Sequence, residues 1–123
     1  MAWVIVTVAI CWAAGTEILV LLTSEAFRAG GAILPMLAAA LGLMQLGHLL
    51  ALVPLSAKDL GVYRWLKVGH ALLAVAASAW GALAGGLWGV AVASLVSSAA
   101  YGVSAAVVNV RILGARRVAL AQA

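Results

Sequence analysis

Apolar residues fill four long stretches of the chain, and short segments that hold most of the charged residues separate them. The stretches cover residues 2–22, 32–54, 63–84 and 87–110. At a rise of about 1.5 Å per residue, a helix of about 20 residues crosses the roughly 30 Å hydrocarbon core of a bilayer. None of the stretches alternates with a period of two, which argues against the strands of a membrane barrel. The pattern therefore predicts an all-α protein with a single membrane domain, a bundle of four transmembrane helices.

The composition indicates that lipid is the solvent for most of the surface. Of the 123 residues, 67% are hydrophobic and 8% are charged, whereas a soluble domain carries about 25% charged residues. The net charge of +4 does not indicate nucleic acid, because the basic residues lie at helix ends, where they report membrane orientation. Of the seven basic residues, only Arg28 lies on one predicted side of the membrane. The positive-inside rule therefore predicts that both termini, on the other side, are cytoplasmic. The basic residues of that cytoplasmic side are Lys58, Arg64, Lys67, Arg111, Arg116 and Arg117.

Glu17 lies in the last turns of the first apolar stretch. A carboxylate at that depth costs about 1–3 kcal/mol unless it is paired, protonated or hydrated. One reading is a proton or cation site. The other is that Glu17 lies close enough to the helix end to reach water and pairs with Arg28 across the turn. Glu25 lies three residues before Arg28, and most exposed pairs of this kind are merely solvated.

Gln45 and His48 are three residues apart and share a face of the second predicted helix, which should point into the bundle. We expect that helix to end at Pro54, six residues after His48. His70 lies about as far into the returning helix, so antiparallel neighbours would bring a cluster of Gln45, His48 and His70 to similar depth. The alternative is that these residues are hydrogen-bonded polar contacts between helices. No metal site is predicted, because zinc normally has three or four protein ligands.

Small residues recur at four-residue intervals in the last two predicted helices. A glycine-rich segment at 81–89 joins these helices almost without a loop. Such spacing lets helix backbones approach closely, and it predicts packing positions without indicating a function. These positions are Gly81, Gly85, Gly89, Ser94, Ser98 and Gly102.

The run EILVLLTSEAFRAGGAILPML at 17–37 and the run GLWGVAVASLVSS at 86–98 occur in this order. Together they resemble late helices of the polysaccharide flippases, the exporters of lipid-linked oligosaccharides (O-antigen type) in the multidrug/oligosaccharidyl-lipid/polysaccharide superfamily. The resemblance covers nearly the whole chain. It implies a bacterial inner membrane location and alternating access between two six-helix halves around a cationic cavity. Four helices correspond to the last third of such a transporter, so no substrate-binding residue is carried over from the family.

The hypothesis from the sequence is a membrane transport element with a lipid-linked oligosaccharide substrate, no cofactor, and a homo-oligomeric or larger membrane assembly. Gln45, His48 and His70 would line the inner half of a path. Glu17 and Arg28 would lie at its outer mouth, where Arg28 would steer phosphate or acidic sugar groups. Two alternatives are a non-transporting small subunit of a larger membrane complex and a small multidrug resistance-type proton-coupled exporter. An enzyme is not predicted, because the two histidines and three acidic residues are too few and too scattered.

Overall fold

A computed structural model describes residues 2–121, and every element in this range is helical. Three stretches, Ile5–Leu22, Glu25–Ser56 and Leu60–Ala115, are long and apolar enough to cross a membrane. The all-α prediction is therefore confirmed. The elements are α1 (Ala2–Leu22), the 3₁₀ helix η1 (Glu25–Ile33), α2 (Leu34–Leu50), the short α3 (Leu52–Ser56) and α4 (Leu60–Ala121).

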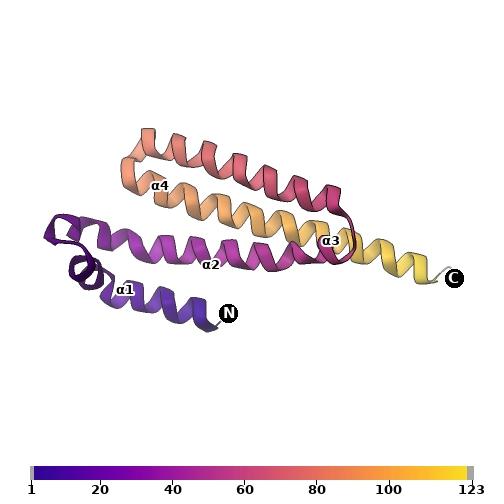
Figure 1. Ribbon diagram of the computed structural model, residues 1–123, viewed down its shortest axis with the longest axis horizontal. Coiled ribbons are helices and arrows are strands. Elements are labelled where there is room, and N and C mark those ends of the chain that lie inside the picture. The colour runs from indigo at the N-terminus through magenta and orange to yellow at the C-terminus, as the bar shows by residue number, and fades with distance from the viewer. Residues whose placement is uncertain (1, 122–123) are drawn as a thin grey trace.

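The long helix α4 doubles back on itself, and its two arms lie antiparallel (Figure 1). The reversal takes place at Gly85 and Gly86, whose φ/ψ angles are −145°/17° and 56°/−135°. Glycine adopts the positive φ of Gly86 without a clash because it has no Cβ. We call residues 60–84 the first arm and residues 87–121 the second arm. The last two of the four predicted helices are thus joined within one element, and three long helical elements replace four separate helices.

Close to this turn, the backbones of the two arms touch at Gly81 and Gly89. A Cβ added to either glycine would collide with the carbonyl group of the other. At Gly85 and Gly102, in contrast, an added Cβ would meet nothing within 4 Å. Gly85 therefore forms part of the turn and is not a packing position. At Gly102, which the sequence also predicts as a packing position, the structure shows no close contact.

Two of the serines of the second arm lie inside the bundle. Ser97 and Ser98 are buried, and the Ser97 hydroxyl donates a hydrogen bond of 3.1 Å to the carbonyl oxygen of Ser94. This bond satisfies the hydroxyl of Ser97 within its own helix, a common solution for serine in apolar surroundings.

The helices pack as a row in which α1 lies outermost. α1 packs against η1 and α2, and α2 packs against α4, whose second arm lies between α2 and the first arm (Figure 1). Most of the buried apolar side chains are small, and many leucines, valines and tryptophans face outward. Small residues at helix contacts and large apolar residues outside are expected where lipid is the solvent. The buried alanines are Ala40, Ala51, Ala91, Ala93 and Ala105.

The prediction that the second helix ends at Pro54 is wrong. α2 ends at Leu50, and the short α3, which contains Pro54, continues to Ser56. Proline has no N–H to donate to the carbonyl group four residues earlier, which here is that of Leu50. Asn109 of the second arm donates its Nδ2 amide to this oxygen at 2.9 Å. A tertiary contact thus compensates for the hydrogen bond that Pro54 removes.

A tight turn at 57–59 joins α3 to α4 and replaces the longer loop that the sequence predicts. Lys58 has a φ of 62°, and the N–H groups of Lys58 and Asp59 donate to carbonyl groups of α3 at 3.0 and 2.9 Å. This is a Schellman motif, in which glycine usually takes the position of Lys58. Asp59 then caps α4 by accepting a 3.1 Å hydrogen bond from the N–H of Val62. The cap explains why α4 begins at Leu60.

Replacing Lys58 by glycine should stabilise the fold by roughly 0.5–1 kcal/mol, because glycine adopts a positive φ without steric cost. Unfolding in mixed micelles of a mild detergent and dodecyl sulfate, followed by circular dichroism, would measure the change. Lys58→Ala is the control, since it removes the same charge and keeps the strain. Equal gains in both variants would show that charge, and not φ, is responsible.

Candidate functional site

Two imidazole rings contact the ring of Tyr101, in the second arm of α4. The Tyr101 side chain is only 2% exposed. His70 of the first arm stacks on its ring, with centroids 4.3 Å apart and planes inclined by 21°. His48 of α2 meets the ring edge-on, at 5.4 Å and 78°. We call His48, His70 and Tyr101 the imidazole–tyrosine cluster.

The α4 hairpin and a glycine of α2 place these rings together. His70 lies 15 residues before Gly85, and Tyr101 lies 15 residues after Gly86, so antiparallel arms bring the two rings to one level. On the α2 side, a Cβ at Gly47 would lie 2.5 Å from Tyr101 Cδ1. The ring therefore occupies the space that Gly47 leaves open, and His48 follows directly on α2.

Lys67 adds a positive charge to this cluster. Its Nζ lies 5.4 Å from the centroid of the Tyr101 ring and 5.7 Å from that of Tyr63. An ammonium group within about 6 Å of an aromatic face is attracted by the π electrons. Because Lys67 precedes His70 by one turn of the first arm, the cluster combines a cation, two imidazoles and a phenol.

Two buried polar atoms of the cluster, His70 Nδ1 and the Tyr101 hydroxyl, have no hydrogen-bond partner among the described residues. A cavity of about 200 Å³ lies beside them, and its lining includes both side chains and Ser104. Buried polar atoms generally have a protein or water partner. The pocket has room for several water molecules, although most of its lining is apolar and its polar groups come from His70, Tyr101, Ser104 and the Trp65 indole. Both atoms are themselves covered in this structure, so water or a polar ligand would reach them only after the surrounding side chains move.

A second polar site, the ion cluster of Glu17, Glu25 and Arg28, connects the end of α1 to η1. Arg28 donates from Nε and Nη2 to the two carboxylate oxygens of Glu25, at 2.7 and 2.8 Å. Its Nη1 donates to Glu17 Oε1 at 3.2 Å. The pairing of Glu17 with Arg28 is thus present, and all three side chains are exposed. The hydrogen bonds from Arg28 lower the pKa of Glu25, and the carboxylates of Glu25 and Glu17, in that order, raise the pKa of Arg28.

Two carboxylates around one guanidinium leave the ion cluster with a net negative charge. A local field of this sign repels anions. The arrangement does not favour the expected role of Arg28 in steering phosphate or acidic sugar groups, because three of its five N–H donors already bond the two carboxylates.

The structure brings His48 and His70 together and leaves Gln45 outside. A spacing of three residues turns a helix by about 300°, so the two side chains point about 60° apart. His48 faces α4, whereas Gln45 is exposed and lines a groove of about 310 Å³ beside Trp3 and Thr7 of α1.

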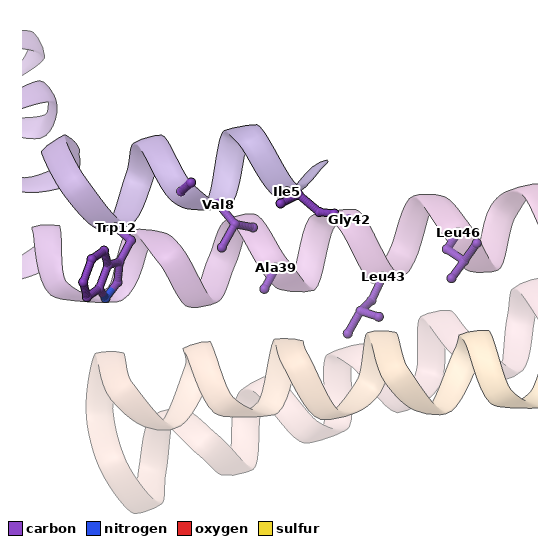
Figure 2. A pocket seen from close by; sticks show the side chains of 8 residues that line it. Ile5, Val8, Trp12, Ala39, Gly42, Leu43 and Leu46 are labelled. Atoms are coloured by element: carbon purple, nitrogen blue, oxygen red, sulfur yellow. The ribbon is translucent and has the colours of Figure 1, made fainter. Parts of the chain in front are cut away.

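A larger groove of about 530 Å³ lies between α1 and α2 (Figure 2). Its lining carries no charged group, and the Trp12 indole N–H is its only side-chain hydrogen-bond donor. Such a surface can accommodate lipid chains or apolar side chains, and it offers no group for catalysis. The lining residues are Ile5, Val8, Ala9, Trp12, Ala39, Gly42, Leu43 and Leu46.

Among the described residues, no group of three or more His, Cys, Asp and Glu side chains could hold a metal ion. Comparison of the chain with known protein families, curated proteins and solved structures found no match. Function is therefore inferred from the geometry of the two polar sites.

Proposed function

We propose that this chain is a membrane transport element, similar in organisation to the last four helices of a lipid-linked oligosaccharide flippase. The observation that supports it most is the imidazole–tyrosine cluster, whose unpartnered polar atoms adjoin a cavity of about 200 Å³. Polar groups within a membrane are costly and often mark the path of a substrate or ion. Most buried polar atoms in structural contacts have a partner; Asn109 Oδ1 in the second arm is a further buried atom without one among the described residues.

In this proposal the chain crosses a bacterial inner membrane four times, through α1, the α2–α3 pair and the two arms of α4. The α3–α4 turn would face the cytoplasm together with both termini. The distribution of charge supports this orientation, because cytoplasmic ends carry an excess of Lys and Arg. Lys58 lies in that turn and Arg64 follows it in the first arm, while η1, at the opposite end of α2, holds Arg28 between two carboxylates.

Transport would consist of movements of helices, with no covalent chemistry by the protein. Tyr101 contacts Gly47 on one side and His70 on the other, so a separation of α2 from α4 would expose the cluster. Its phenol, its imidazoles and Lys67 would then be available to hydrogen-bond phosphate or sugar hydroxyl groups of the substrate.

The test is translocation of a short-chain fluorescent lipid-linked oligosaccharide in liposomes that contain the protein. His70→Gln and Tyr101→Phe should each lower the rate about two- to tenfold, since a hydrogen bond contributes about 0.5–1.5 kcal/mol. Tyr63→Phe makes the same chemical change outside the cluster and should leave the rate unchanged. Wild-type rates in both cluster variants, or no translocation by the wild-type protein, would contradict the proposal.

A proton-coupled exporter of the small multidrug resistance type fits the position of Glu17 less well than the transport element proposed above. Such an exporter needs a carboxylate in mid-helix. Glu17 lies in the last two turns of α1, where it is exposed and bonded to Arg28.

A second candidate is a non-transporting subunit of a larger membrane complex. The exposed amide of Gln45 on α2 favours it, because a polar group facing outward at this depth requires a partner. Absence of translocation, together with co-purification of a different membrane protein, would support this candidate.

A further inference from the structure

Gln45 lies at the midpoint of an apolar segment. α2 and α3 together cover residues 34–56, and Gln45 is the twelfth of these 23 positions. At about 1.5 Å per residue this segment is roughly as long as the hydrocarbon core is thick. In a membrane, the side chain of Gln45 would therefore lie near the middle of the bilayer, too deep for its amide to reach water.

The Gln45 amide faces out of the bundle and has no hydrogen-bond partner among the described residues. Its side chain is exposed and lies in the groove formed with Trp3, Thr7 and Leu41. The Thr7 hydroxyl, which lines the same groove, donates its hydrogen to the carbonyl oxygen of Trp3 at 2.9 Å. Lipid chains offer neither donor nor acceptor, so this amide is unsatisfied in a single copy of the chain.

We propose that a second copy of this chain covers the exposed face of α2, with the Gln45 amides of the two copies hydrogen-bonded to each other. A primary amide carries donor and acceptor together. Two amides related by a two-fold axis each donate and each accept, and an isologous contact brings a residue on the axis against itself. Glutamine side chains are known to join membrane helices in this way.

The surroundings of Gln45 suit a second helix. The same groove includes the half-buried Ala38, and a small residue lets another helix approach closely. Gly42 also lines the groove but is already buried within the chain. A different membrane protein would need a matching polar group at the same depth. A second copy necessarily carries one, because its own Gln45 lies at the same level.

Disulfide cross-linking in native membranes tests the proposal, in a Cys11→Ala background that removes the single natural cysteine. Leu41→Cys reports on the proposed face, since Leu41 is 53% exposed and lies one turn before Gln45. Leu72→Cys is the control, because Leu72 is 67% exposed at the midpoint of the first arm. We expect a covalent dimer from the position 41 variant and none from the position 72 variant. Adding Gln45→Leu should lower the dimer yield about threefold, and Gln45→Asn should retain most of it.

The mass of the particle in mild detergent is the second measurement. We expect twice the chain mass of 12.4 kDa, falling toward one chain in Gln45→Leu. A monomeric wild-type protein, a stoichiometric complex with a different protein, or equal cross-linking at positions 41 and 72 would overturn the proposal. Cross-linking that Gln45→Leu leaves unchanged would also overturn it. None of these outcomes depends on whether the protein transports a substrate.

Discussion

Replacement of Gly89 by alanine is expected to force the arms of α4 apart and to destabilise the protein by at least about 3 kcal/mol, the upper part of the range for overpacked cores. The added Cβ would collide with the carbonyl group of Gly81. This obstacle is backbone, so no side-chain rotation can relieve the clash. Unfolding in mixed micelles, followed by circular dichroism, would measure the loss.

Gly69→Ala is the matched control for that experiment. Gly69 also lies in α4, but a Cβ there would meet nothing within 4 Å. Because alanine favours a helix over glycine, we expect this variant to gain roughly 0.5–1 kcal/mol. If Gly69→Ala lost as much stability as Gly89→Ala, the effect would come from glycine replacement in general and not from the contact between the arms.

Replacement of Gly47 by alanine should disrupt the imidazole–tyrosine cluster. The new Cβ would lie 2.5 Å from Cδ1 and 2.8 Å from Cε1 of Tyr101. The ring cannot move aside freely, because His48 and His70 flank it. We expect a loss of about 2–3 kcal/mol in stability, measured by unfolding in mixed micelles, and a loss of any translocation in the liposome assay.

A double-mutant cycle would show whether this loss arises at Tyr101. Tyr101→Ala alone should cost about 3–5 kcal/mol, because it leaves a cavity. In that background Gly47→Ala has no ring to displace and should be close to neutral. The expected coupling between the two sites is therefore at least about 2 kcal/mol. Additive losses would show that the two residues act independently.

The apolar pattern correctly predicted an all-helical chain, because each helix in lipid must satisfy the hydrogen bonds of its own backbone. α1 covers the same residues as the first predicted stretch, and the reversal at Gly85 and Gly86 falls in the predicted gap between 84 and 87. The pattern failed at Pro54, because the carbonyl group freed there is satisfied by Asn109, 59 residues away in sequence from Leu50. No local signal reports such a contact. α4 also continues to Ala121, beyond the predicted end at 110, because polar residues outside the bilayer can extend a helix.

For the candidate site, the number of residues between a side chain and the nearest turn was the most useful feature of the sequence. It placed His48 and His70 at similar depth on either side of the α3–α4 turn, and the structure brings them to one ring. The same reasoning about the Gly85–Gly86 turn would have identified Tyr101, which lies as far after it as His70 lies before it. The number of residues from a turn gives depth but not direction, so it could not show that Gln45 points away from His48. Two residues that share a helix face can still contact different neighbours, because that face is wider than a single helix contact.

The two-residue turn of α4 also bears on the order in which the bundle assembles. Contacts beside the turn, such as Gly81 with Gly89, close a loop of only a few residues, and the entropy cost of closure rises with loop length. Pairing can then advance along the arms until His70 meets Tyr101. The bond between Asn109 and Leu50 spans 59 residues and is costlier to form first. Assembly is therefore favoured from the α4 hairpin toward α2 and α1. The helices that are synthesised first, α1 and α2, would then remain unpacked in the membrane until α4 is complete.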